Sequence, residues 1–319
     1  MSAPAILARG LAKRFGEKRA VSGVDFEIAT GEVFGLLGPN GAGKTTTLRM
    51  LAGMLAPDEG VASVVGFDVV RSSRDVRERV GLLTEQPGLY DRLTTRENLA
   101  FYAQIYGVSP AEGEARIQRL LELLGIWAVR DERAGTLSKG TRQKVAIARA
   151  LVHDPQVIFL DEPTSGLDPE AARTVRDSIS ELASSGRTLV LCTHNLFEVE
   201  RLCRRVAVMR PGASGEGGRI VASTEVAGLR KGRREVEVTV AGDAGAFTGL
   251  TSALPGVASV QAQGSKVILS LAEGESVEAR TPEVVRALVN AGAQVRAVIP
   301  HEVALEDAYL SLVAEEGAA

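Results

Sequence analysis

One stretch constrains the fold of this chain more than any other: Gly35–Leu48, which reads Gly-Leu-Leu-Gly-Pro-Asn-Gly-Ala-Gly-Lys-Thr-Thr-Thr-Leu. Residues 33–37 predict a short buried strand, residues 38–43 a loop, and Lys44 the start of a helix. The Gly-x-x-x-x-Gly-Lys-Thr pattern therefore has the strand-loop-helix context of a phosphate-binding loop. Glycines let backbone N–H groups turn toward one anion, at which the helix also points its positive end. A glycine-rich turn without a ligand is the alternative.

The side chains of this loop match the chemistry of a nucleotide bound with Mg²⁺. Lys44 can reach the outer phosphates, and the Thr45 hydroxyl can bind the metal that bridges them. The residues expected to contact the nucleotide here are Gly38, Asn40, Gly41, Ala42, Gly43, Lys44, Thr45 and Thr46. By itself, the loop predicts only that a nucleotide is bound.

Composition narrows the class of protein. A chain of 319 residues with 45% hydrophobic content can form one large and one smaller domain. Its net charge of −3 gives no overall attraction to nucleic acid or to a membrane.

The first residues lack a signal-peptide pattern and no apolar run is long enough to span a bilayer, so we expect a cytoplasmic chain. Cys192 and Cys203 show no metal-ligand or disulfide spacing, and we expect them only to occupy space in the core or at the surface.

Two segments flank the loop in the sequence. Ala5–Arg9 and Val24–Ile28 alternate as an antiparallel pair, separated by a polar, turn-like stretch that contains Phe15. The ring of Phe15 could stack on a purine base or pack in the core, and the residues leave both open. Leu93–Leu124 has a helical pattern, capped at Thr94 or Thr95, and we interpret it as a helical insertion.

Acidic residues follow a second apolar strand. Val157–Leu160 predicts a buried parallel strand that delivers Asp161 and Glu162 at its carboxyl end, where α/β proteins place ligands. Neighbours in a strand point to opposite faces, so we expect Asp161 to serve Mg²⁺ and Glu162 to deprotonate the attacking water. The last strand expected, Thr188–Cys192, leads to His194, which could donate to the terminal phosphate.

A second polar, glycine-containing loop precedes an alanine-rich helix at Gly135–Leu151. Ser138 is placed as the N-cap of this helix. Free N–H groups there could form another anion site. An ordinary capped helix is the alternative that the segment alone favours.

At this point the sequence resembles the ATP-binding cassette (ABC) ATPases over residues 6–223. Five motifs occur in the order of that family: Gly38–Thr45 resembles Walker A, Leu137–Thr141 the signature loop, Leu160–Glu162 Walker B, Ser165–Asp168 the D-loop, and His194 the switch histidine. The resemblance implies an α/β P-loop ATPase that binds ATP and Mg²⁺, with an antiparallel β subdomain and a helical insertion at about residues 87–150.

The resemblance also implies a head-to-tail dimer. ATP would lie between Walker A of one chain and the signature loop of a second copy, so Ser138, Gly140 and Asp168 would meet the nucleotide of the partner. Phe15 becomes the expected adenine-stacking residue.

Two departures from the family pattern stand out. The signature reads Leu-Ser-Lys-Gly-Thr in place of the commoner Leu-Ser-Gly-Gly-Gln, and Lys139 would attract the γ-phosphate if it points inward. Alignment of Gly81–Pro87 puts Glu85, not Gln86, at the position that contacts Mg²⁺. Which of the two side chains does so stays open.

Beyond residue 223 the pattern changes to that of a second domain, residues 224–319. The order β-α-β-β-α-β suggests a small ferredoxin-like α+β fold, followed by a helix at about Ala304–Ala314. Pro211–Gly218 is interpreted as a turn or a short flexible connector, and the basic cluster Arg230–Arg234 as a solvated linker in preference to a lipid-facing patch.

Residues 86–99 and 301–310 resemble subunits that drive ABC-2 type permeases, including drug-resistance and antibiotic exporters. The resemblance implies an ATP-hydrolysing subunit that energises export of a drug, antibiotic or lipid-like substrate through a separate membrane permease. The chain would then lie on the inner face of the cell membrane, held there by the permease.

The alternative is a soluble cassette ATPase that acts on nucleic acid or ribosomes. The chain has no long coiled-coil insertion, no second cassette and no basic surface in its charge balance, all of which disfavour that alternative. A phosphate-loop kinase would not explain the signature loop.

Overall fold

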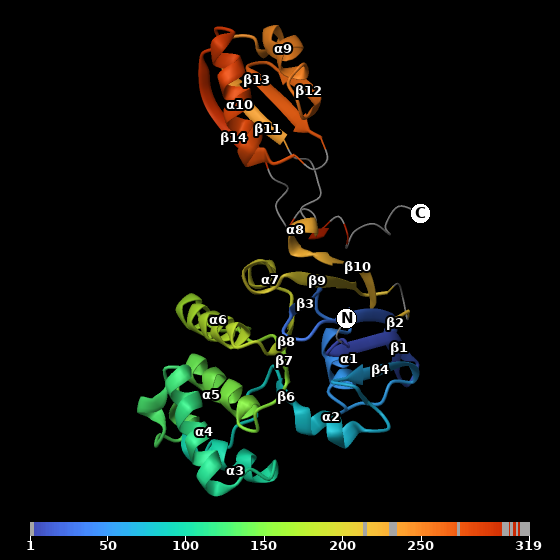
Figure 1. Ribbon diagram of the computed structural model, residues 1–319, viewed down its shortest axis with the longest axis vertical. Coiled ribbons are helices and arrows are strands. Elements are labelled where there is room, and N and C mark those ends of the chain that lie inside the picture. The colour runs from blue at the N-terminus through green and yellow to red at the C-terminus, as the bar shows by residue number, and fades with distance from the viewer. Residues whose placement is uncertain are drawn as a thin grey trace. The chain divides into compact units, whose positions relative to one another are not determined.

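The computed structural model describes residues 3–212, 216–229, 235–272 and 275–301, with Glu306, Tyr309, Leu310 and Leu312 from the tail. The chain divides into two compact units, Met1–Val226 and Ala227–Ala319 (Figure 1). Each unit buries a hydrophobic core of its own. We describe the two units separately.

An antiparallel sheet opens the first unit, in the order β2-β1-β4-β5. Its strands are β1 (Ile6–Phe15), β2 (Lys18–Ile28), β4 (Glu59–Val64) and β5 (Phe67–Asp68). The predicted pair is confirmed, but the strands are longer than the alternation indicated. Phe15 is the last residue of β1 and pairs with Lys18, so it does not lie in the turn.

A six-stranded sheet carries the phosphate loop, in the order β10-β9-β3-β8-β7-β6. Its strands are β3 (Val33–Leu37), β6 (Val80–Leu83), β7 (Val157–Asp161), β8 (Thr188–Thr193), β9 (Arg205–Arg210) and β10 (Arg219–Glu225). All pairs are parallel except β9 with β10. The prediction that Thr188–Cys192 is the last strand is wrong, because β9 and β10 follow it.

The strand pair β9-β10 decides between the two interpretations of Pro211–Gly218 in favour of a turn. The described part of Pro211–Gly218 joins two paired strands within the first unit, so it does not separate two domains. Residues 213–215 lie outside the described part of the chain, as do the basic cluster at 230–234 and most of the helix predicted at 304–314.

Helices surround the parallel strands: α1 (Lys44–Leu51), α2 (Ser73–Arg79), α5 (Lys139–Leu151), α6 (Pro169–Ser184) and α7 (Leu196–Leu202). The short helix α8 (Val226–Leu229) contains the boundary between the two units. The helical insertion holds α3 (Thr95–Ile105) and α4 (Pro110–Leu123), with short 3-10 turns at Trp127–Val129 and Ala134–Thr136. Figure 1 shows α3, α4 and α5 grouped together.

The core of the first unit lies where the two sheets meet. The buried cluster joins residues of β1, β2 and β4 to residues of α1 and of the parallel strands. Phe26 of the antiparallel sheet stacks on Phe34 of β3, with ring centroids 5.5 Å apart. This contact packs the antiparallel sheet, which carries Phe15, against β3, the strand that leads into the phosphate loop.

The second unit has the predicted β-α-β-β-α-β order. Its elements are β11 (Glu235–Val240), a 3-10 turn at Ala244–Phe247 that leads into α9 (Thr248–Ser252), β12 (Val257–Gln263), β13 (Lys266–Leu271), α10 (Val277–Asn290) and β14 (Val295–His301). The antiparallel sheet order β12-β13-β11-β14 matches a ferredoxin-like split β-α-β arrangement. Val236, Val238 and Leu269 are fully buried in its core.

Among the residues that the structure describes, no helix has both the length and the apolar character needed to cross a bilayer.

Candidate functional site

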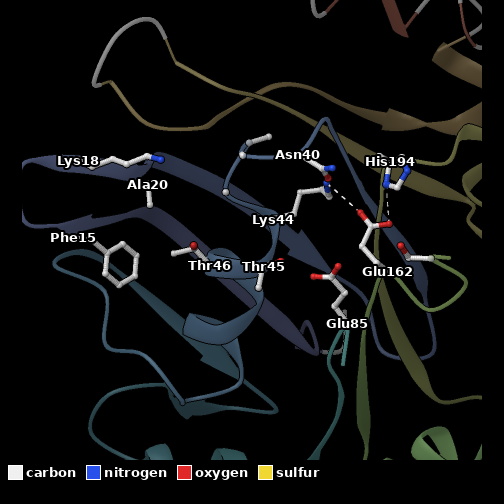
Figure 2. A pocket seen from close by; sticks show the side chains of 14 residues that line it. Phe15, Lys18, Ala20, Asn40, Lys44, Thr45, Thr46, Glu85, Glu162 and His194 are labelled. Atoms are coloured by element: carbon white, nitrogen blue, oxygen red, sulfur yellow. Dashed lines mark ion pairs between the residues drawn. The ribbon is translucent and has the colours of Figure 1, made fainter. Parts of the chain in front are cut away.

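A pocket of about 490 Å³ lies over the phosphate loop. It is lined by Phe15, Lys18, Ala20, Asn40, Gly41, Ala42, Gly43, Lys44, Thr45, Thr46, Glu85, Glu162, Ser165 and His194. Figure 2 draws Phe15 at one end and Glu162 with His194 at the other, with Lys44, Thr45 and Thr46 between them. Segments far apart in the sequence therefore meet around the loop.

The phosphate loop begins at Gly38 and ends at Gly43, as predicted from the sequence. Gly43 is the N-cap of α1 with φ of 91°, and a Cβ there would lie 2.7 Å from the Ala20 carbonyl oxygen, so only glycine fits. No side chain caps α1, and no acidic residue occupies its first turn. The N–H groups of that turn, which lack helical partners, are consequently available to an anion in the pocket.

Lys44 supplies a positive charge at the floor of this pocket. Its side chain is only 5% exposed, and its Nζ donates to the carbonyl oxygens of Gly38, at 2.7 Å, and Pro39, at 3.2 Å. The same atom lies 3.3 Å from Glu162 Oε1. Lys44 thus links the phosphate loop to the acidic end of β7.

Asp161 and Thr45 form the other polar contact between the loop and β7. The Thr45 hydroxyl donates to Asp161 Oδ1 at 3.1 Å. Asp161 is 2% exposed, and burial raises the pKa of its carboxyl, an effect that the hydrogen bond from Thr45 opposes. A hydroxyl beside a buried carboxylate is an oxygen donor set that fits Mg²⁺.

A metal held by protein side chains alone does not fit this place. Within the described ranges, no three His, Cys, Asp or Glu side chains come close enough to hold a metal ion. Mg²⁺ usually keeps several waters and phosphate oxygens when one or two carboxylates bind it. The pair of Thr45 and Asp161 suits that mode of binding.

Glu162 leaves the strand at an unusual backbone angle. Its φ is 49°, in the left-handed region that non-glycine residues rarely adopt, and such strain gathers at functional sites. The expectation that Asp161 and Glu162 point to opposite faces is wrong, because β7 ends at Asp161 and Glu162 turns toward Lys44 and His194. Both carboxylates therefore reach the surroundings of the phosphate loop.

His194 and Glu162 are directly paired. His194 Nδ1 lies 2.9 Å from Glu162 Oε2. An ionised carboxylate can only accept, so the ring proton of this pair lies on Nδ1. Glu162 Oε1 is buried and, in the described part of the chain, accepts no hydrogen bond. That oxygen faces the Lys44 ammonium, whose Nζ is 3.3 Å away, and a carboxylate oxygen beside the phosphate loop can serve as a general base.

At the far end of the pocket, Phe15 is 53% exposed. Lys18, which pairs with Phe15 across the β1-β2 hairpin, and Ala20, two residues further along β2, line the same wall of the pocket. An exposed ring at this place can stack on a flat base. Lys18, Ala20 and Ser165 are pocket residues that the sequence reasoning missed, although the hairpin register and the short step from Glu162 to Ser165 point to them.

Glu85 lines the pocket, whereas Gln86 is not among the lining residues. This placement agrees with the family alignment of residues 81–87. Asp161 and Gly38 lie behind the lining, where they contact Thr45 and Lys44.

Ser138, Gly140 and Asp168 lie outside this pocket. Ser138 accepts a hydrogen bond from the Thr141 N–H and caps α5, while Asp168 caps α6 through Glu170 and Ala171. The side chain of Lys139 does not extend freely from α5, since its Nζ donates to the Gly166 carbonyl oxygen at 2.7 Å. The chain thus places these residues on a second, separate edge.

Comparison with known proteins agrees with this geometry. Residues 21–165 match the family model described as ABC transporter. The chain is 44% identical over 214 residues to "Nod factor export ATP-binding protein I" of Paraburkholderia xenovorans (strain LB400), covering 66% of this chain and 70% of that protein. It is 44% identical over 205 residues to "ABC transporter ATP-binding protein NatA" of Bacillus subtilis (strain 168), covering 63% of this chain and 83% of that protein.

Solved structures show the same fold. One described as the ATP binding subunit of an ABC transporter has a TM-score of 0.62 and 30% identity, covering 71% of this chain and 92% of that chain. Another, cbiO1 from Clostridium perfringens, described as part of the ABC transporter complex cbiONQ, also has a TM-score of 0.62, with 28% identity over 70% of this chain and 89% of that chain.

Proposed function

The chain belongs to the ABC transporter family as an ATP-binding, ATP-hydrolysing subunit, and from that premise we propose that it energises export through a separate ABC-2 type permease. One observation carries the ATPase part: the phosphate loop, Glu162 and His194 meet in one pocket. The residues of that pocket divide into three tasks, which are binding, metal support and water activation.

Binding is assigned to the loop and the hairpin. The backbone of Gly38–Thr46 cradles the phosphates, Lys44 neutralises their charge, and Phe15 stacks on the adenine. Thr45 and Asp161 hold Mg²⁺, with Glu85 at the edge of its site. When bound, the metal stabilises negative charge that develops on the phosphate oxygens.

Water activation is assigned to Glu162. Its Oε1, which lies 3.3 Å from Lys44 Nζ, takes the proton of the attacking water, while His194 holds the other carboxylate oxygen at 2.9 Å. His194 also lies where it can act on the terminal phosphate, because it lines the same pocket.

A head-to-tail dimer completes the site. Ser138, Gly140 and Asp168 lie on an edge outside the pocket of their own chain, so a second copy is needed to bring such an edge to the nucleotide. ATP would then be bound by both chains, and hydrolysis would release them. The motion of closing and opening is what a permease could use.

The export direction is supported by relatives. One of them is named for Nod factor export. The description of cbiO1 as part of a transporter complex supports only a partner for the chain and carries no direction of transport. We assign this chain a drug, antibiotic or lipid-like substrate class on the subgroup resemblance of residues 86–99. A peripheral location on the inner face of the membrane follows from attachment to the permease.

An apolar face on the helical insertion is the place we assign to the permease. Tyr90, Phe101, Ile105 and Tyr106 are exposed there, and Tyr90 packs edge-on against Phe101 with ring centroids 5.2 Å apart. A groove of about 280 Å³ beside it is lined by Tyr102, Tyr106 and Met54 among others. Exposed apolar patches of this kind mark sites of protein interaction.

The test is copurification from detergent-solubilised membranes of cells that produce the tagged chain. We expect a polytopic membrane protein to copurify with the wild-type chain and to be lost with Ile105→Glu. Val61→Glu is the matched control, because Val61 is also 60% exposed but lies on β4. Copurification of ribosomes or nucleic acid in place of a membrane protein would contradict the proposed role in transport.

A further inference from the structure

The signature loop and the D-loop of the same chain are joined by one lysine. Lys139, the first residue of α5, donates from Nζ to the carbonyl oxygen of Gly166 at 2.7 Å. Gly166 has φ of 64°, and a Cβ at this position would collide with that Nζ. The backbone of the D-loop is therefore shaped around the lysine.

Two further contacts attach α5 to the segment that follows Glu162. The buried Gln143 donates to the Pro163 carbonyl oxygen at 2.8 Å. Gly140 packs so closely on α6 that a Cβ there would lie 2.7 Å from the Cβ of Ala171. The N-terminal half of α5 thus contacts the chain within the D-loop, at Gly166, and on both sides of it, at Pro163 and Ala171.

The opposite side of this segment is held by α7. The Thr164 hydroxyl donates to Glu198, whose side chain is only 1% exposed. The contacts at Pro163 and Thr164 are buried, whereas the contact between Lys139 and Gly166 is at the surface. Lys139 is accordingly the side chain that holds the outer part of the loop.

The position of this outer part bears on the phosphate pocket. Ser165, which immediately precedes Gly166, lines the pocket together with Glu162 and His194. A shift at Gly166 would move Ser165 and pull on the strained backbone at Glu162. The lysine therefore connects the edge that carries Ser138 to the wall of the pocket in the same chain.

We infer that Lys139 is a positioning residue: by holding the Gly166 carbonyl oxygen it makes the signature loop and the D-loop of one chain move together. This role deepens the proposed function and rests on its head-to-tail dimer. When the signature loop of one chain contacts the partner's ATP, it would then shift the D-loop wall of the pocket in its own chain. Lys139 would couple the two ATP sites of the dimer and act on turnover more than on ATP affinity.

The experiment compares Lys139→Met, Lys139→Arg and Lys144→Met in the full chain. Methionine keeps the length of the lysine but cannot donate, and arginine restores a donor. Lys144 is the matched control, because it lies on the same helix and its Nζ donates to the Leu124 carbonyl oxygen at 3.0 Å, away from the D-loop. Thermal unfolding of each variant reports whether it folds.

For Lys139→Met we expect kcat for ATP hydrolysis to fall about three- to thirty-fold, with KM for ATP changed less than about twofold and the Hill coefficient lowered toward one. Lys139→Arg should recover most of the kcat, and Lys144→Met should match the wild type. In the nucleotide-free chain, amide exchange at residues 164–168 should be faster in Lys139→Met alone.

Three results would overturn this role. The first is unchanged amide exchange at residues 164–168 in Lys139→Met. The second is an effect confined to KM, which would mean direct attraction of Lys139 to the phosphate. The third is an arginine variant as impaired as the methionine variant. A wild-type chain that hydrolyses ATP but never dimerises would contradict the proposed assembly instead. The exchange measurement distinguishes the two failures, because it needs neither ATP nor a second copy.

Discussion

Two helix N-termini in this chain are each assigned to an ATP, α1 to the chain's own nucleotide and α5 to that of a partner, and they are built differently. The first turn of α1 has no side-chain cap, begins at a glycine, and faces a pocket whose floor carries the buried Lys44. The first turn of α5 is capped by Ser138 and lies at the surface, and its neighbouring lysine is bound to Gly166.

The difference in construction indicates a difference in role. The N-terminus of α1 can bind an anion within its own chain, whereas the N-terminus of α5 can only strengthen the binding of an anion that another surface already holds. Free N–H groups, a buried ammonium and an enclosed volume let α1 bind a polyphosphate within a single chain. The N-terminus of α5 offers a hydroxyl and a dipole but no enclosed volume, so its contribution becomes large only when another surface covers it. The contrast explains why we assign the two termini to opposite sides of one nucleotide.

The largest effect is expected at the pocket beside α1. Glu162→Gln removes the carboxylate that accepts the proton of water but preserves the shape of the side chain and its contact with His194. We expect kcat for ATP hydrolysis to fall by about 10² to 10⁴, with ATP affinity little changed. Turnover measured beside equilibrium ATP binding checks this, and unchanged hydrolysis would remove Glu162 from its role.

A smaller but still large effect is expected at α5. Ser138→Asp keeps an N-cap of equal quality and brings a negative charge toward the partner's phosphates, so hydrolysis should fall about 100-fold or more. Ser138→Asn, which also caps but is neutral, should stay within about tenfold of the wild type. ATP binding to a single chain should be the same in both variants. Equal activity of the two would show that no phosphate approaches this terminus.

A third effect concerns the thermal stability of the nucleotide-free chain. We expect Asp161→Asn to raise this stability although it lowers ATP hydrolysis. Burial raises the pKa of Asp161, so its ionised form costs the folded state free energy that the unfolded chain does not lose. Asp161→Asn should therefore raise the Tm of the nucleotide-free chain at neutral pH, by roughly 2–4 °C, the shift that about 1 kcal/mol gives in a domain of this size.

The pH dependence gives the control for that variant. The gain should shrink as the pH falls through the raised pKa of Asp161, and it should vanish below the unfolded value, where the carboxyl is protonated in both states. The same variant should lose most ATP hydrolysis, because a carboxylate that supports Mg²⁺ is gone. A Tm that drops at neutral pH would show that Asp161 contributes to folding through contacts and not mainly through its charge.

Local sequence chemistry predicted the phosphate loop well. Val33–Leu37 is a strand and α1 starts at Lys44, because an apolar run, a glycine loop and a helix former leave little choice. The capping box at Thr94 and Glu97 was likewise visible as Thr-x-x-Glu. The order of the five motifs then brought the right segments together, although it could not show which side chains touch.

The features of the fold and of the site that the sequence did not predict have physical causes. β9 and β10 escaped notice because the glycine-rich Pro211–Gly218 looked like a linker, and only the pairing of the strands shows that it joins them. In the second unit Pro282, a residue type that favours the first turn of a helix, lies inside α10, which already begins at Val277 after the Ser276 cap. The turn of Glu162 out of its strand depends on tertiary contacts with Lys44 and His194, which no local pattern encodes.

The central claim is that one ATP is shared between α1 of one chain and α5 of another, and mixing two inactive variants tests it most directly. Lys44→Ala should lose ATP binding at its own loop, and Ser138→Asp should spoil only the edge it offers to a partner. A mixed dimer of the two contains one intact site, formed by the unaltered Lys44 of one chain and the unaltered Ser138 of the other. We predict that each variant alone is inactive and that ATP hydrolysis reappears on mixing. A mixture that stays inactive while mixed dimers form would contradict the shared site.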